Sequence, residues 1–172
     1  RVYEKVFAAS QDGRGIILEV GMGTNNPLIP SNMGGYFTPG GSLRAWQAYF
    51  SNFEILGADI DREILFAEGR IKTFWLDQIK RESFSDLHVY LKSKSLDFVI
   101  IDGLHQPFAD LNTLVELLPY LKKGGHIFVE DIEPSYSIKL FWKLVRLLLP
   151  EGYSGILLRQ KGGSIFDLQR RT

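Results

Sequence analysis

The chain has 172 residues, and its 20 lysines and arginines balance its 20 aspartates and glutamates. Because no stretch is strongly basic, the charge gives no indication of a nucleic-acid or membrane partner and favours a small-molecule ligand. The chain has no cysteine, which excludes disulfides and zinc-thiolate sites, and we expect a cytoplasmic protein. The length fits one domain over residues 1–172. Because the chain opens on Arg1 and not on methionine, we also expect upstream residues to be missing.

Strand-like and helix-like segments alternate along the chain. The first strand is predicted at 16–20 and the first helix at 42–50, with Ser42 as its N-cap. Strands at 55–58 and 71–76, a short helix at 84–93 and a strand at 96–101 follow. A helix at 108–121, a strand at 126–129 and a helix at 138–149 come next, before a hairpin of 153–158 and 164–168. This order predicts an α/β fold: a doubly wound, mostly parallel seven-stranded sheet of Rossmann-like type that ends in an antiparallel hairpin.

Acidic residues follow the predicted fourth and fifth strands. Asp102 and His105 lie in "IDGLH", and Glu130 and Asp131 lie in "VEDI". The carboxyl ends of parallel strands meet at one edge of a sheet, where ligands bind. Carboxylates gathered there would be costly to desolvate alone, so a divalent cation or a set of partners is implied. The alternatives are a loop histidine at His105 and a helix-capping acidic pair at residues 130–131.

The loop after the first strand indicates the kind of cofactor. Gly21 and Gly23 allow close approach of the backbone to a ligand, but Asn26 stands where a dinucleotide-binding loop has its third glycine. No lysine follows as in a phosphate-binding loop. Glu19 is unsuited to a pyrophosphate but suits the ammonium group of an amino acid. For this loop alone, a simple turn with an exposed glutamate is an equal alternative.

Further acids end the second and third strands. Asp59 can accept hydrogen bonds from both ribose hydroxyls, and Asp77 with Gln78 can reach an adenine amino group. Asp61 competes with Asp59, and either aspartate alone could be a cap or a solvated strand end. Together with the glycine loop they indicate an adenosine that carries an amino acid, which is S-adenosylmethionine. Ser42 could bring a helix start to the methionine carboxylate or act only as a helix cap.

These motifs together resemble a known family. The glycine loop, "GGSLRAW", "GADIDREILF", "RIKTFWLDQ", "IDGLH" and "GGHIFVEDI" are similar to class I S-adenosylmethionine-dependent methyltransferases, and more narrowly to metal-dependent macrolide-sugar O-methyltransferases of the mycinamicin type. The resemblance implies that Asp102, Glu130 and Asp131 bind Mg²⁺ and that His105 is the general base. This chain departs from the family pattern at Ile101, where many relatives carry a second acid.

The resemblance leads us to expect methyl transfer to a hydroxyl group of a sugar or glycoside. Asp102 would act with the metal to activate the hydroxyl, and His105 would take its proton. Three alternatives are a metal-independent O-methyltransferase, a module that binds the cofactor without turnover, and a nicotinamide oxidoreductase. The high apolar density of the helix predicted at 138–149 could mark the subunit interface of a homo-oligomer, although it is more typical of a core helix.

Overall fold

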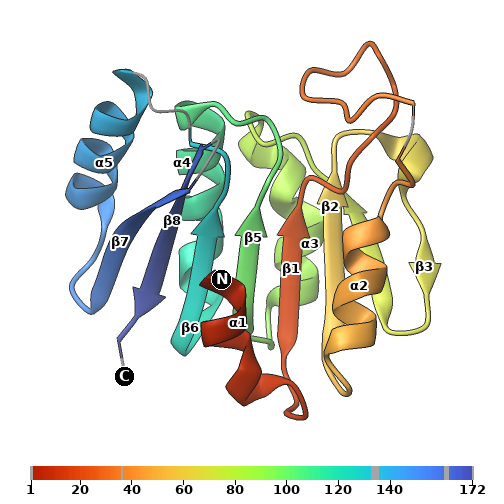
Figure 1. The fold of residues 1–172 in the computed structure, drawn as a ribbon, viewed down its shortest axis with the longest axis horizontal. Coiled ribbons are helices and arrows are strands. Elements are labelled where there is room, and N and C mark those ends of the chain that lie inside the picture. The colour runs from red at the N-terminus through yellow and green to blue at the C-terminus, as the bar shows by residue number, and fades with distance from the viewer. Residues whose placement is uncertain (1, 36, 133–135, 161–162, 172) are drawn as a thin grey trace.

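A computed structural model describes residues 2–35, 37–132, 136–160 and 163–171. Within this part of the chain, eight strands form one sheet in the order β3-β4-β2-β1-β5-β6-β8-β7 (Figure 1). The strands are β1 (Ile16–Val20), β2 (Glu54–Asp59), β3 (Ala67–Glu68), β4 (Ile71–Trp75), β5 (Leu96–Ile101), β6 (Leu121–Val129), β7 (Tyr153–Gln160) and β8 (Gly163–Arg170). The α-helices are α1 (Val2–Phe7), α2 (Gly41–Tyr49), α3 (Ser85–Leu91), α4 (Pro107–Leu117) and α5 (Tyr136–Leu148).

The sheet is mostly parallel, as predicted. β4, β2, β1, β5 and β6 run parallel to one another, whereas β8 and β7 add an antiparallel hairpin beside β6. The doubly wound fold with a terminal hairpin is therefore confirmed. The sheet has eight strands and not seven, because the two-residue β3 pairs antiparallel with β4 at the other edge. Too short to show an alternating pattern, β3 could not be recognised in the sequence.

Helices cover both faces of the sheet. α1 and α2 lie over one face and α3, α4 and α5 over the other (Figure 1). Along β1 the side chains alternate between the two layers, so that Ile17 packs toward α1 and α2 while Leu18 and Val20 pack toward the other helices. An aromatic cluster that includes Phe7, Phe50 and Phe98 fills the first layer. The strand ends that carry the site therefore rest on a core that is closed from both sides.

Three predicted boundaries need correction. The helix expected to reach residue 121 ends at Leu117 and is followed by a 3₁₀ turn, because Pro119 cannot donate the backbone hydrogen bond that a longer α-helix requires. β6 consequently begins at Leu121. The N-cap of α2 is Gly40 and not Ser42, since Gly40 adopts φ +71° without a steric cost. Ser42 lies inside the first turn, with its hydroxyl free for a tertiary contact.

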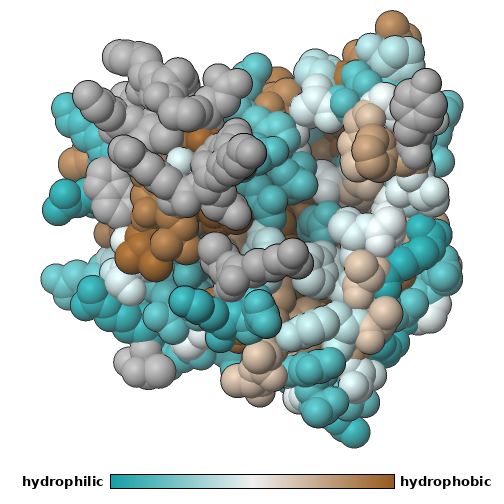
Figure 2. Space-filling view, viewed as in Figure 1, coloured by the Kyte–Doolittle hydropathy of each residue, from teal (hydrophilic) through white to brown (hydrophobic). Residues whose placement is uncertain are grey.

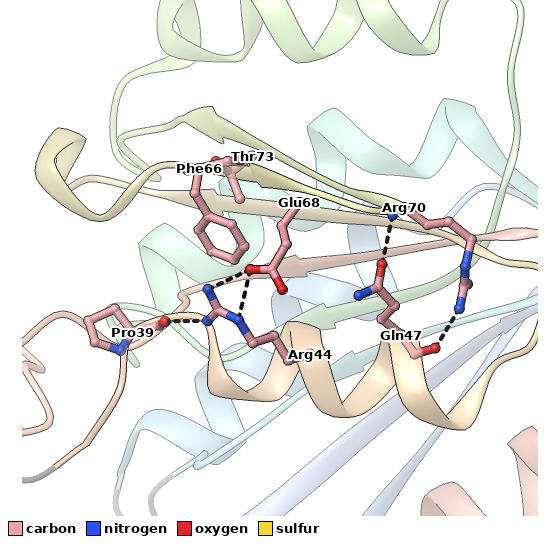
Figure 3. Close-up of polar contacts among 7 residues, drawn as sticks. All are labelled: Pro39, Arg44, Gln47, Phe66, Glu68, Arg70 and Thr73. Atoms are coloured by element: carbon pink, nitrogen blue, oxygen red, sulfur yellow. Dashed lines mark hydrogen bonds and ion pairs between the residues drawn. The ribbon is translucent and has the colours of Figure 1, made fainter.

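Polar contacts hold α2 against the β3–β4 edge of the sheet (Figure 3). The Arg44 guanidinium donates to the Glu68 carboxylate at 2.9 and 3.1 Å and to the Pro39 carbonyl oxygen at 3.1 Å. One turn further on, the side-chain oxygen of Gln47 accepts from the backbone N–H of Arg70 at 2.7 Å. α2 is thus tied to the strand pair β3–β4 and also to the loop that precedes α2 itself. Its first turn is held firmly in place.

The surface is mostly polar on the face that carries α1 and α2, and apolar residues gather over β7 and β8 (Figure 2). Ile156 on β7 and Leu147 and Leu148 on α5 are exposed apolar side chains. The expected homo-oligomer stays a prediction. Among the described residues, no helix combines the length and the apolar character needed to cross a bilayer.

Candidate functional site

The loop after β1 passes very close to the end of β5. The Asp102 N–H donates to the Val20 carbonyl oxygen at 2.8 Å, and a Cβ atom at Gly21 would overlap the Asp102 carbonyl oxygen. Gly21 adopts φ +96° and Gly23 adopts φ +78°, which L side chains rarely tolerate. A Cβ atom at Gly23 would also overlap the Met33 sulfur. Gly21 is therefore required by the close approach of the Asp102 backbone, and Gly23 by its positive φ angle. Their predicted role in binding a ligand stays a prediction.

Glu19 is a buried acid beside this loop. Only 4% of its surface is exposed, and its carboxylate accepts from Ser42 Oγ at 2.5 Å and from Trp46 Nε1 at 2.6 Å. Burial raises the pKa of Glu19 to about 7, although both hydrogen bonds act in the opposite direction. A cationic ligand at this point would favour the charged form. Trp46 was not predicted as a site residue, because its contact spans 27 positions of the chain.

Asp59, at the end of β2, organises the glycine loop. Its carboxylate accepts from the backbone N–H of Met22 at 2.7 Å and from that of Asp61 at 2.9 Å. Burial also raises its pKa. Each carboxylate oxygen has a second lone pair, so further acceptor capacity is left for a ligand. Asp61 instead accepts from Thr24 Oγ1 at 2.5 Å and does not line the cavity described below, which favours Asp59 of the two.

The two predicted adenine residues lie beyond β4. The Asp77 carboxylate pairs with Lys80 Nζ at 2.9 Å, and Gln78 is 7% exposed. The Gln78 carboxamide is directed at the loop after β5 and at α4: its Oε1 accepts from the Leu104 N–H at 2.7 Å, and its Nε2 donates to Thr113 Oγ1 at 3.0 Å. Both residues line the cavity, but the side chain of Gln78 already has protein partners.

Asp102, His105 and Asp131 come together at the ends of β5 and β6. One ligand atom from each lies within 4.8 Å of the others, and His105 Nε2 is 3.8 Å from Asp102 Oδ1. Burial raises the pKa of Asp102 to about 6, with a further contribution from Asp131, while His105 lowers it. His105 (φ +53°) and Asp131 (φ +49°) both adopt a left-handed backbone conformation that is unfavourable for side chains other than glycine. Such strain is concentrated at functional sites.

Glu130 is not part of this group of three. Its backbone N–H donates to the Ile101 carbonyl oxygen at 2.9 Å, and it does not line the cavity. Burial and the nearby Asp131 raise the pKa of Glu130 to about 7. The carboxyl group therefore senses its neighbour's charge, and its predicted role as a metal ligand stays a prediction.

The described residues enclose a cavity of about 710 Å³ at this edge of the sheet. Ten predicted site residues line it: Glu19, Gly21, Gly23, Ser42, Asp59, Asp77, Gln78, Asp102, His105 and Asp131. Seven of them come from β1, β2, α2 and the loops after β1 and β4, and the other three follow the neighbouring strands β5 and β6. Ile29, Pro30, Met33 and Phe37 of the loop between β1 and α2 add an apolar wall.

A buried acid that the sequence did not single out lies behind the cavity. Asp110 on α4 is 4% exposed, and burial raises its pKa to about 7, with a further contribution from Asp102. It shares a helix face with Leu114 and Leu117, which lie four and seven positions later. A charged residue on the apolar face of a predicted helix was the available signal.

Comparison with known proteins places this geometry in context. A family model described as a methyltransferase domain matches residues 43–132. The 8-demethyl-8-alpha-L-rhamnosyl tetracenomycin-C 2'-O-methyltransferase of Streptomyces olivaceus is 34% identical over 137 residues, which are 78% of this chain and 33% of that protein. The mycinamicin VI 2''-O-methyltransferase of Micromonospora griseorubida is 31% identical, covering 78% of this chain and 31% of that protein. The chain spans about a third of the length of these curated relatives.

Solved structures share the fold. The MycE methyltransferase from the mycinamycin biosynthetic pathway, in complex with Mg, SAH and mycinamycin VI, matches with a TM-score of 0.73 at 22% identity, over 99% of this chain and 48% of that chain. An rRNA methylase from Streptococcus thermophilus matches with a TM-score of 0.60 at 16% identity, over 99% of this chain and 95% of that chain. At these identities the likeness establishes the fold alone.

Proposed function

Since the chain belongs to the family of methyltransferase domains, we propose that it transfers a methyl group from S-adenosylmethionine to a hydroxyl group of a sugar or glycosylated small molecule, assisted by Mg²⁺. One observation carries the proposal: a single cavity is lined both by the acids suited to an adenosine with an amino-acid moiety and by the cluster Asp102, His105 and Asp131. The named relatives, which act on a rhamnosyl and a mycinamicin substrate, support the acceptor class.

The methyl donor fits the part of the cavity after β1, β2 and β4. Glu19 would pair with the ammonium group of the donor. That positive charge would favour the ionised form of Glu19, which burial disfavours when no ligand is bound. Asp59 and Asp77 would accept hydrogen bonds from the ribose and the adenine, and Ser42 would support the amino-acid end through Glu19. Gly21 and Gly23 leave room for the donor to approach the backbone.

The cluster after β5 and β6 fits a magnesium ion. Carboxylate oxygens are the ligands Mg²⁺ prefers, and the pKa of Asp102 is raised by burial and by Asp131, a penalty that a cation would relieve. Glu130, one residue before Asp131, completes the proposed ligand set. A bound magnesium ion would supply Lewis acidity that makes an acceptor hydroxyl easier to deprotonate.

His105 is the proposed general base. Its Nε2 would take the hydroxyl proton while the C–O bond forms and the C–S bond of the sulfonium breaks, leaving a neutral thioether. Asp102, at 3.8 Å from that nitrogen, would stabilise the resulting imidazolium. Because the leaving group is neutral, alignment of donor and acceptor contributes more to the rate than assistance to the leaving group.

Asp102→Ala tests the proposal. We expect methyl transfer from labelled S-adenosylmethionine to rhamnosylated polyketides to fall about a hundredfold or more, whereas the affinity for S-adenosylhomocysteine in calorimetry changes only a few fold. Asp97→Asn is the matched control: this acid lies near the other end of β5 and accepts from the Ile16 N–H at 2.9 Å. It should lower stability but leave metal dependence intact.

Other outcomes would select the alternatives. Activity that survives thorough chelation would indicate a metal-independent enzyme in which His105 acts alone. A chain that binds S-adenosylhomocysteine without turnover on any glycoside would be a cofactor-binding module. Tight binding of NADH in place of S-adenosylhomocysteine would overturn the proposal in favour of an oxidoreductase.

A further inference from the structure

The Gln78 carboxamide connects three separate elements. Gln78 lies three residues after the end of β4, yet its Oε1 accepts from the backbone N–H of Leu104, which lies between Asp102 and His105. Its Nε2 donates to Thr113 Oγ1 on α4. The cavity wall beyond β4 is thereby joined to the loop that follows β5 and to the helix behind that loop.

The donors and acceptors around Gln78 determine how its carboxamide is oriented. A backbone N–H can only donate, so Leu104 requires the carboxamide oxygen. Thr113 gives its single hydroxyl hydrogen to the Ala109 carbonyl oxygen at 2.8 Å and can therefore only accept from the amide nitrogen. Buried Asp110 also interacts with the Gln78 side chain, which lowers the pKa of that acid. A flipped carboxamide would lose these bonds together.

The main chain of Gln78 is anchored to the same helix. Asn112 Nδ2 donates to the Gln78 carbonyl oxygen at 2.6 Å. Thr113 is fully buried and Gln78 nearly so, which means that water cannot replace their bonds without opening the packing between the loop and α4. The carboxamide is therefore a fixed support and not a surface group that samples several partners.

The loop supported by Gln78 has an unfavourable conformation. His105 adopts φ +53°, and a Cβ atom at Gly103 would overlap Gln78 Oε1. A residue in the left-handed region keeps that conformation only when its surroundings impose it. The hydrogen bond to Leu104, the residue between these two, is one such constraint and acts directly on the segment that carries Asp102 and His105.

We propose that Gln78 is a positioning residue, which holds the Asp102–His105 loop so that the metal-binding cluster keeps its geometry. This inference rests on the proposed function and revises the sequence-based prediction that Gln78 binds the adenine. Its carboxamide oxygen and nitrogen are engaged by Leu104 and Thr113, so its main action is on the loop after β5. Asp77 is left as the residue beyond β4 that faces the adenine.

Gln78→Leu keeps the approximate volume and removes both hydrogen bonds. We expect Mn²⁺ affinity, measured by calorimetry in the presence of S-adenosylhomocysteine, to fall about fivefold or more and turnover about tenfold or more. S-adenosylhomocysteine affinity should stay within about threefold. Gly103→Ala pushes against the same oxygen from the loop side and should give the same pattern. It keeps the proposal testable if Gln78→Leu does not fold.

Asn112→Ala is the matched control, because it removes a bond to Gln78 from the same helix but spares the carboxamide. It should leave Mn²⁺ affinity within about twofold. In a Gln78→Ala background, Gly103→Ala should have little additional effect, since the oxygen it meets is gone.

Two results would overturn the inference. In the first, Gln78→Leu weakens S-adenosylhomocysteine binding tenfold and leaves Mn²⁺ affinity unchanged. In the second, Asn112→Ala lowers Mn²⁺ affinity as much as Gln78→Leu does. Wild-type chain that binds no Mn²⁺ at all would instead refute the proposed function, and this inference with it.

Discussion

Replacing Glu19 by glutamine should stabilise the ligand-free chain at alkaline pH while weakening donor binding. Burial raises the pKa of Glu19 from an ordinary 4.5 to about 7, so the folded state holds this proton more tightly than the unfolded chain does. Below both values the acid is neutral in either state, and it contributes no pH dependence. As the pH rises from 4.5 to 7, the unfolded chain loses its proton first and the fold loses stability.

The size of this loss follows from the two pKa values. Each unit of difference corresponds to about 1.4 kcal/mol, so the full penalty of the buried charge is about 3 kcal/mol once the pH is well above 7. Glutamine carries no charge at any pH and still offers an oxygen to Ser42 or Trp46. Between pH 5 and pH 8, Glu19→Gln should therefore gain about 2–3 kcal/mol relative to the wild type.

Urea denaturation at pH 5 and pH 8 measures this difference. Other raised acids, such as Asp110, are present in both proteins and cancel. Glu63→Gln, an exposed acid, is the control for loss of a carboxyl group and should stay within about 0.5 kcal/mol of wild type at both values. A Glu19→Gln difference that does not change with pH would refute the idea that Glu19 is destabilised by burial. S-adenosylhomocysteine affinity should fall for Glu19→Gln, since the ammonium partner is lost.

Two further substitutions test the strained backbone around the site. Gly21→Ala should lower the free energy of unfolding by about 2–4 kcal/mol and abolish donor binding, because its Cβ atom overlaps the Asp102 carbonyl oxygen. Gly34→Ala is the control: Gly34 adopts φ +72° with open space around it, so the loss should be only about 1 kcal/mol. Equal losses for the two variants in urea denaturation would contradict the steric explanation. His105→Gly should leave stability within about 1 kcal/mol, because glycine adopts φ +53° readily, yet reduce methyl transfer about a hundredfold; activity near wild type would exclude His105 as the base.

The sequence predicted the edge of the sheet where the cavity lies, because the carboxyl ends of parallel strands must meet there. Asp102 and Asp131 end neighbouring strands, and the structure brings them together with His105. Gly21 and Gly23 were singled out because they directly follow β1, although a simple turn was an equal alternative for this loop alone. These residues could be singled out because each follows a strand that is itself recognisable from the nearby sequence.

Contacts between distant segments could not be predicted in this way. Ser42 was assigned as an N-cap from residue preference, but Gly40 supplies the cap and the Ser42 hydroxyl reaches Glu19, 23 positions away. The bond from Gln78 to Leu104 spans 26 positions and involves a backbone group that carries no sequence signal. Such pairings depend on how the loops pack, which periodicity and capping rules do not describe.

The close approach of Gly21 to the Asp102 backbone limits how this domain can be redesigned. Because the loops after β1 and β5 touch backbone to backbone, a graft of either one from a relative must be accompanied by the other. The segment around Leu28, which is 88% exposed, has no such restriction on its outer side. If the chain has the proposed function, chimeras that exchange residues 26–32 alone would test whether this loop sets the acceptor preference.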